Sequence, residues 1–174
     1  YLYKTFDFGK TWKKIINGIP KEHFTRVLRA DPIKEGLLYT GTEYGIYISY
    51  DDGESWNSFQ KNLPQVPITD LKIKDNSLIV ATQGRGIWVL DDLTVLHQLN
   101  PEIIDDEINL FKPKESYRLS GSGGKKSKIA GTNLENGVIV YYNLKTYDSK
   151  KDSVSISFSD LNGKIIKTFS NFDS

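Results

Sequence analysis

Residues 49–56 read Ser-Tyr-Asp-Asp-Gly-Glu-Ser-Trp, and this octapeptide decides the fold. A second copy at residues 5–12 reads Thr-Phe-Asp-Phe-Gly-Lys-Thr-Trp, so both follow the pattern Ser/Thr-x-Asp-x-Gly-x-Ser/Thr-Trp. The two stretches begin 44 residues apart, and Pro20 and Pro64 keep the same register in their flanks. Such a fixed period is the sequence signature of a repeat architecture, in which each copy forms one small structural unit.

Alternation of apolar and polar residues predicts the first strand of each repeat, at 24–30 and 67–74, and the other strands follow after turns. Strands are expected at 24–30, 37–42, 45–50 and 56–60 in one repeat, at 67–74, 78–82 and 86–90 in the next, and at 12–16 before them. A degenerate third copy at 86–92 parallels residues 45–51, but the glycine and the tryptophan that follow the aspartate in the octapeptide are missing. A period of about 40–45 residues with four strands per unit is typical of propeller blades. The expected fold is all-β: a partial β-propeller of about two and a half four-stranded antiparallel blades.

The pattern changes after Leu99. An acidic stretch at 101–107 favours a short helix, and strands are predicted at 108–111, 137–144, 153–159 and 164–169. Asn162-Gly163 between the last two strands predicts a hairpin. An immunoglobulin-like β-sandwich segment is expected here, incomplete because such domains run to about 100 residues. The expected organisation is propeller blades at 1–118, a Gly/Ser/Lys-rich linker or loop at 119–131, and the immunoglobulin-like segment at 132–174.

Composition excludes several classes of protein. The 174 residues carry a net charge of +1, which argues against a nucleic-acid partner. Cysteine is absent, so neither a disulfide framework nor a thiolate site is expected. No apolar run approaches the ~20 residues of a membrane span. The two histidines, His23 and His97, are too few and too far apart for a metal site, and no cofactor is expected. Tyr1 falls inside a repeat, so the chain is interpreted as a fragment or a processed product.

The octapeptide has the chemistry of a turn that closes itself. Its glycine suits a positive φ, its aspartate accepts backbone N–H groups, and its hydroxyls extend that network. Each tryptophan is expected to bury much of ~150–250 Å² against its blade. A carboxylate that caps a turn is stabilised as the anion, which disfavours acid catalysis, so no catalytic residue is predicted. The expected structural residues are Thr5, Asp7, Gly9, Thr11 and Trp12, and Ser49, Asp51, Gly53, Ser55 and Trp56.

The two octapeptides resemble the Asp-box, or bacterial neuraminidase repeat, of sialidases, two-propeller xyloglucan hydrolases and the sortilin ligand-binding propeller. The stretch 81–93, with 136–142 and 160–164, is similar to the C-terminal end of bacterial envelope proteins with sortilin-like or glycosyl-hydrolase-like repeats. In those proteins an immunoglobulin-like segment follows the propeller. The resemblance implies a secreted, periplasmic or outer cell surface protein, with the remaining propeller blades or an envelope assembly as partners.

Candidate ligand residues lie on the rim away from the Asp-box turns, because loops between strands two and three, and between blades, project there. In the propellers that the boxes resemble, this rim carries the ligand site. Arg85 stands between two glycines and suits a carboxylate, although an arginine that binds neighbouring carbonyls is the alternative. The candidate rim residues are Glu43, Tyr44, Gln83, Arg85 and His23.

Two functions remain open from the sequence. The first is a binding module for a peptide, protein or glycan, because every strong motif is structural. The second is a glycoside hydrolase, which needs two carboxylates about 5–5.5 or 6.5–9.5 Å apart. Such a pair would draw mostly on blades outside this chain, so the hydrolase hypothesis names no catalytic residue here.

Overall fold

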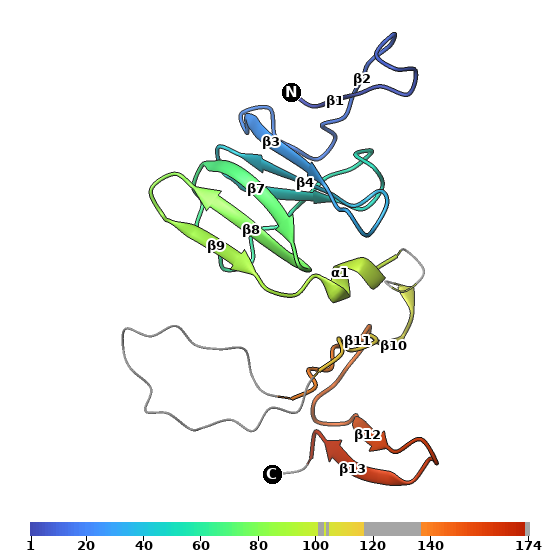
Figure 1. Cartoon of the computed structure of the whole chain (residues 1–174). Helices are drawn as coiled ribbons and strands as arrows, with labels where there is room; N and C mark the ends of the chain where they lie inside the picture. Colours follow the sequence, from blue (N-terminus) through green and yellow to red (C-terminus); the bar gives the residue numbers. More distant parts are fainter. Residues whose placement is uncertain (101–102, 104, 117–136, 173–174) are drawn as a thin grey trace.

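The secondary structure of the described chain is mostly β, in small antiparallel sheets, with one short helix. The computed structural model describes residues 1–100, 103, 105–116 and 137–172 (Figure 1). The first strands are β1 (Tyr3–Lys4), β2 (Lys13–Lys14), β3 (Thr25–Ala30), β4 (Leu38–Thr42), β5 (Gly45–Ser49), β6 (Asn57–Ser58), β7 (Ile68–Lys74), β8 (Ser77–Thr82) and β9 (Ile87–Leu90). Helix α1 (Thr94–Gln98) precedes β10 (Ile108–Leu110), β11 (Tyr142–Leu144), β12 (Ser155–Ser159) and β13 (Ile165–Ser170).

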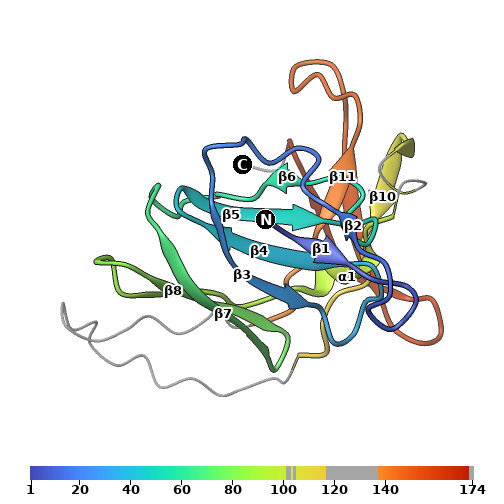
Figure 2. The same cartoon turned by 90° about the horizontal axis from the view of Figure 1, so that it is seen from above.

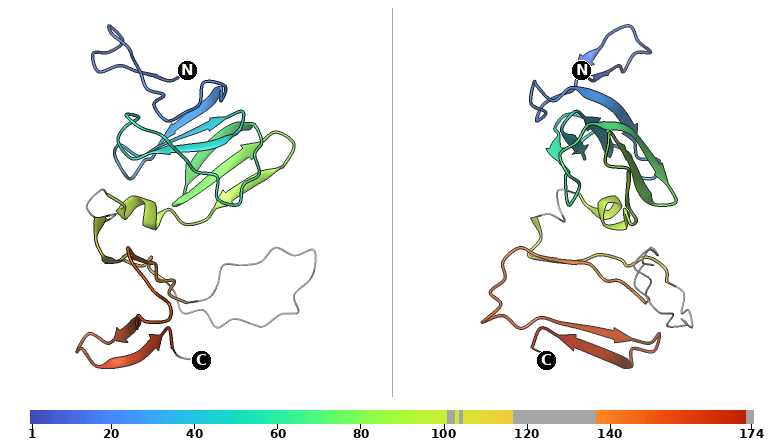
Figure 3. Two further views of the ribbon diagram at one scale, coloured as in Figure 1. Left: turned by 180° about the vertical axis from the view of Figure 1, so that it is seen from behind. Right: turned by 90° about the vertical axis from the view of Figure 1, so that its left-hand side faces the viewer.

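The repeat region forms three sheets whose strands pair in chain order. Their orders are β1-β2, β3-β4-β5-β6 and β7-β8-β9, and every pairing is antiparallel. The sheets follow one another from the N-terminal end of the molecule, as Figures 1 and 3 both show. The predicted strands are therefore confirmed within a few residues at each end, except that β2 and β6 are only two residues long.

Two clusters of apolar side chains lie between these sheets, and β4 contributes residues to both. Strand β4 is buried along its whole length, so its alternate side chains enter different clusters. Leu38 belongs to the cluster on the side of β1 and β2, whereas Tyr39 belongs to the cluster on the side of β7 to β9. Gly41 allows the close approach, since a Cβ there would lie 2.5 Å from Cγ2 of Ile68. The second sheet is thus packed on both faces.

Helix α1 was not predicted, and it is fixed to the second sheet through Asp31. The buried Asp31 carboxylate accepts hydrogen bonds from the backbone N–H groups of Ile33 and Lys34 and lies 3.0 Å from Nε2 of His97 in α1. The Lys34 ammonium binds the carbonyl of Leu99 just beyond the helix. Helix α1 and its flank, which have no repeat signature, therefore cover the apolar cluster of the second and third sheets, into which their Leu93 and Leu96 pack.

The C-terminal part contains two small sheets, β10-β11 and β12-β13. The Asn-Gly hairpin is confirmed, because β12 and β13 pair around a turn with Gly163 at φ 82°. The strand predicted at 137–144 is wrong over most of its length, since only Tyr142–Leu144 pairs. The linker predicted at 119–131 lies outside the described residues. Of the helix predicted at 101–107, residues 103 and 105 are helical, and residues 101, 102 and 104 lie outside the described part.

Candidate functional site

The first octapeptide, called the first Asp-box here after the motif that it resembles, forms the self-closing turn that its residue types predict. The Thr11 backbone N–H and hydroxyl donate to the two carboxylate oxygens of Asp7, at 2.8 and 2.7 Å. The Thr5 hydroxyl donates to the same carboxylate at 2.9 Å and accepts from the Gly9 backbone at 2.7 Å. Gly9 has φ 87°, a value that only glycine adopts without strain.

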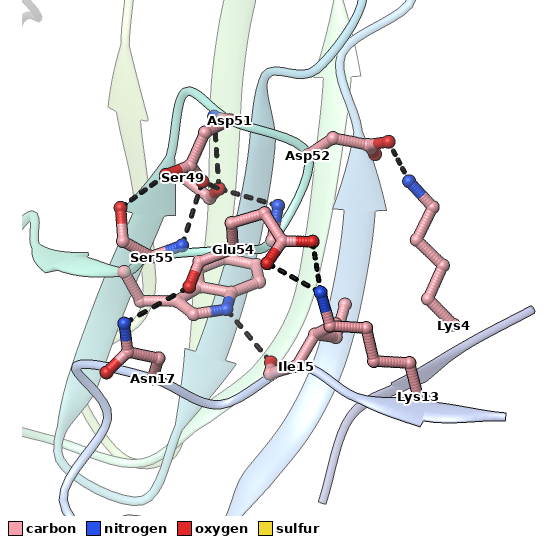
Figure 4. A network of polar contacts seen from close by, with 11 residues as sticks. Lys4, Lys13, Ile15, Asn17, Ser49, Asp51, Asp52, Glu54 and Ser55 are labelled. Carbon is pink, nitrogen blue, oxygen red and sulfur yellow. Dashed lines mark hydrogen bonds and ion pairs between the residues drawn. The ribbon is translucent and has the colours of Figure 1, made fainter.

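The second box repeats this network and adds contacts to the first sheet (Figure 4). Ser55 donates its backbone N–H and its hydroxyl to the Asp51 carboxylate, and Ser49 donates its hydroxyl. The Trp56 indole N–H donates to the Ile15 carbonyl at 3.0 Å. Glu54 binds the Lys13 ammonium at 2.5 and 2.6 Å on the same side. The second box is therefore both a turn and a joint between sheets.

The two tryptophans are not equivalent, which corrects the prediction that each is a buried plug. Trp56 is 3 % exposed and packs among Ile15, Ile19 and Leu38, whereas Trp12 is 59 % exposed. Within the described part of the chain, the Trp12 indole N–H donates to the Gly9 carbonyl of its own turn, at 3.1 Å, and to no other group. Burial of this tryptophan requires a second sheet across from the box, and in the described residues only Trp56 has one.

The turns divide between two ends of the sheets. In Figures 1 and 2 the β1-β2 and β5-β6 turns lie at one end, and the β4-β5 and β8-β9 turns lie at the other. The former hold the two Asp-boxes, and the latter hold Glu43 and Tyr44, then Gln83 and Arg85. The candidate rim residues therefore share the end away from the boxes, as the strand alternation predicts.

His23 and Tyr44 contact each other on this rim. Their rings are stacked, with centroids 4.5 Å apart and an angle of 20° between the planes. Nδ1 of His23 also lies 2.7 Å from the Tyr47 hydroxyl, so the imidazole is fixed from two sides. Burial, followed by the nearby charge of Glu22, raises the pKa of Tyr47, which keeps its hydroxyl neutral as a hydrogen-bond partner. Tyr47 was not among the candidates, since alternation assigns it to a sheet interior.

Glu43 is held by Arg26, a pairing that the sequence did not indicate. Nε and Nη2 of Arg26 lie 2.8 and 2.6 Å from the same Glu43 oxygen. Arg29, three residues further along β3, instead reaches the Asp70 carboxylate at 2.6 Å in the third sheet. The two arginines thus have separate acidic partners and do not converge on one anion site.

Next to the His23–Tyr44 stack lies a pocket of about 170 Å³ whose walls are mainly apolar. Phe24 stands at its edge with 67 % of its surface exposed, and Tyr44 is 49 % exposed on the stack itself. The pocket is lined by Tyr1, Ile16, Ile19, Pro20, Lys21, His23, Phe24 and Thr25. Exposed aromatic rings beside a small concavity can bind the apolar faces of sugars or of side chains.

Gln83 and Arg85 occupy the β8-β9 turn at the same end. Gly84 and Gly86 flank Arg85 at φ 84° and 71°, and a Cβ on either would meet nothing within 4 Å. The Arg85 carbonyl accepts from the Trp88 indole at 3.0 Å, but among the described residues no hydrogen bond or ion pair engages the Arg85 guanidinium. The alternative in which this arginine binds neighbouring carbonyls is not observed there.

The Asp-box carboxylates are held as anions, which suits a structural role. Hydrogen bonds from Thr11 lower the pKa of Asp7. Burial would raise the pKa of Asp51, but hydrogen bonds from Ser55 and Ser49 outweigh it, so the pKa is lowered as well. Neither carboxylate is poised to donate a proton near neutral pH.

No protein-family model matches the sequence, and no curated protein matches it closely enough to count as similar. Within the described ranges, His, Asp and Glu side chains do not gather in groups of three that could hold a metal ion. In the same part of the chain no helix is long and apolar enough to cross a bilayer. Any functional conclusion therefore rests on the geometry of the rim.

Proposed function

We propose that this chain is part of a secreted or cell-envelope Asp-box β-propeller that binds a peptide, protein or glycan through the rim opposite its Asp-boxes. The stack of His23 on Tyr44, with exposed Phe24 beside it, carries the proposal together with Arg85 in the β8-β9 turn at the same end, whose guanidinium pairs with none of the described residues. These groups together offer ring faces and one cation, the elements that bind a ligand with apolar surface and a carboxylate.

The propeller assignment is supported by the way the repeats meet. Three sheets follow one another in chain order, and the second box places Trp56 against residues of the sheet before it. A unit that cannot bury its apolar face alone and does so against its neighbour is the physical pattern of a repeat array. The remaining blades, from the same or another chain, are then the first partners, and the C-terminal strands are proposed as part of an immunoglobulin-like spacer.

Binding is favoured over glycoside hydrolysis by the state of the rim carboxylate. Glu43 is engaged by Arg26 through two nitrogens, so it has the role of an ion-pair partner rather than of a free acid or nucleophile. Hydrolysis needs two carboxylates facing one substrate, and the described rim contributes none in that arrangement. The hydrolase hypothesis has no observation of its own in this chain.

The proposal is tested by a ligand screen followed by matched substitutions. The fluorescently labelled chain is applied to a glycan array and a peptide library, and each hit is titrated with Tyr44→Ala and Arg85→Ala. Their matched controls, Phe6→Ala and Lys10→Ala, remove an exposed aromatic ring and a cation at the Asp-box end. Loss of one stacking or charge contact at a site is expected to weaken binding about tenfold, while the controls change it less than about twofold.

Two outcomes contradict the proposal. Equal effects of the rim and control variants would place the ligand elsewhere on the molecule. Turnover of aryl glycosides or polysaccharides by this chain, abolished by Glu43→Gln, would make it a hydrolase and overturn a binding-only function.

A further inference from the structure

Among the residues that the structure describes, the third sheet has no counterpart of the strand at the edge of the second sheet. In the second sheet β6 pairs with β5, whereas in the described part of the chain β9 pairs only with β8. Ile87 and Val89 of β9 are 72 % and 50 % exposed, while their counterparts in β5, Ile46 and Ile48, are buried against the third sheet. An apolar strand with a free edge is a template for a further strand.

The hydrogen-bond register shows which backbone groups of β9 are free. The Thr82 N–H donates to the Gly86 carbonyl, and alternation along the ladder then turns the backbone groups of Ile87 and Val89 away from β8. In the second sheet the equivalent groups face β6, because the Phe59 N–H donates to the Ile46 carbonyl at 2.8 Å. The free edge of β9 therefore has the same hydrogen-bonding pattern as the occupied edge of β5.

A groove beside this edge repeats the site that Trp56 fills. Trp56 packs between Ile15 and Ile19 on one side and Leu38 and Tyr47 on the other. One repeat later the corresponding residues are Phe59, Leu63, Leu78 and Trp88, and all four line a pocket of about 60 Å³ between the second and third sheets. Within the described residues Trp88 lines this groove as the counterpart of Tyr47, but no tryptophan stands in the place of Trp56, because the degenerate third copy lacks the tryptophan that ends the octapeptide.

We infer that β9 and this groove bind an extended segment of the β6 type, which adds a fourth strand to the third sheet and inserts a tryptophan between the sheets. The occupant is a Trp-containing strand, whose backbone pairs with Ile87 and Val89 and whose indole takes the place that Trp56 has one repeat earlier. This surface is distinct from the His23–Tyr44 rim, so the inference stands or falls separately from the proposed ligand site.

The two grooves differ at the turn that contains Gly18 in the first and Asn62 in the second. Gly18 lets the backbone of Trp56 approach closely, since a Cβ there would lie 2.1 Å from the Trp56 carbonyl oxygen. Asn62 stands at the equivalent position of the next repeat. The occupant is therefore held by the free edge and by the indole, without the backbone contact to this turn.

A peptide supplied in trans tests the inference. A fluorescein-labelled peptide with the sequence of residues 53–60, Gly-Glu-Ser-Trp-Asn-Ser-Phe-Gln, is titrated with the whole chain and followed by fluorescence anisotropy. Binding is expected in the micromolar to millimolar range, and replacement of the peptide tryptophan by alanine is expected to weaken it at least about tenfold. No binding at about 1 mM protein, or equal binding of the alanine peptide, overturns the inference.

Two variants of one residue test the edge itself. Val89→Pro removes an N–H that faces away from β8, so the third sheet keeps its ladder, and proline is tolerated at such edge positions. Val89→Thr keeps both the N–H and a β-branched side chain. Val89→Pro should abolish peptide binding while Val89→Thr preserves it, with unchanged thermal unfolding of both by circular dichroism. Equal binding by the two variants, or a dimer of the chain alone that Val89→Pro dissociates, would overturn the assignment of the occupant.

Discussion

The unequal burial of the two Asp-box tryptophans makes a quantitative prediction about stability. Trp56 leaves 3 % of its surface exposed and Trp12 leaves 59 %. For a tryptophan surface of about 250 Å², this difference amounts to about 140 Å² of additional burial at Trp56, or about 3.5 kcal/mol at about 25 cal/mol/Å². Trp56→Ala is therefore expected to lower the free energy of unfolding by about 3–5 kcal/mol, and Trp12→Ala by about 1 kcal/mol.

The measurement is urea unfolding of both variants and the parent chain, followed by far-ultraviolet circular dichroism because removal of an indole changes the fluorescence. Trp56→Phe is the third variant: it keeps most of the apolar area but leaves the Ile15 carbonyl without its donor, for an intermediate loss of about 1–3 kcal/mol. Equal losses for Trp12→Ala and Trp56→Ala would refute the reasoning, because they would show that the contact between the sheets contributes nothing beyond the local turn.

Three further predictions concern single residues. The pKa of Asp51 is lowered in the folded state, so its contribution to stability is present above about pH 4 and is lost as the pH falls; Asp51→Asn should flatten the fall of the thermal midpoint between about pH 5 and 2. Asp31→Ala removes the carboxylate that accepts from the backbone N–H groups of Ile33 and Lys34 and contacts His97. Urea unfolding should show a free energy of unfolding about 2–4 kcal/mol lower, and amide exchange in α1 should become faster. Gly53→Ala places a Cβ 2.6 Å from Cδ1 of Ile15, whereas a Cβ at Gly9, at almost the same φ, would have its nearest atom 3.7 Å away. Gly53→Ala should therefore lower the free energy of unfolding in urea by about 1 kcal/mol more than Gly9→Ala does, and equal losses for the two variants would contradict this.

The sequence predicts those features that depend on residues close together in the chain. The Asp-box turns follow from Asp, Gly and hydroxyl residues within eight positions, and the Gly163 hairpin follows from its Asn-Gly pair. Alternation places β3 to β5 and β7 to β9 because one face of each strand is apolar. Helix α1 escapes this procedure, since five residues are too few for a helical period to be recognised.

The sequence does not predict what lies across from each element. Both tryptophans have the same local pattern, and only the position of Ile15 opposite Trp56 decides which of them is buried. The rim shows the same limit: Tyr44 and His23 were expected on one face, but their stacking and the engagement of Glu43 by Arg26 depend on contacts across 17 or more residues.

The joint at Trp56 also explains how the rim keeps its shape although it lies at the other end of the sheets. Ile19 packs against Trp56 and belongs to the loop that continues through Pro20 to His23, whose N–H donates to the Pro20 carbonyl at 3.0 Å. At the other side of the stack, Tyr47 belongs to the same apolar cluster as Trp56 and lies 2.7 Å from His23. The rings of Tyr44 and Tyr47, which contact the His23 imidazole, therefore belong to the sheet that Trp56 packs against. In this arrangement a turn motif supports the proposed ligand site at the other end of the sheets, because the burial of one indole holds neighbouring sheets together.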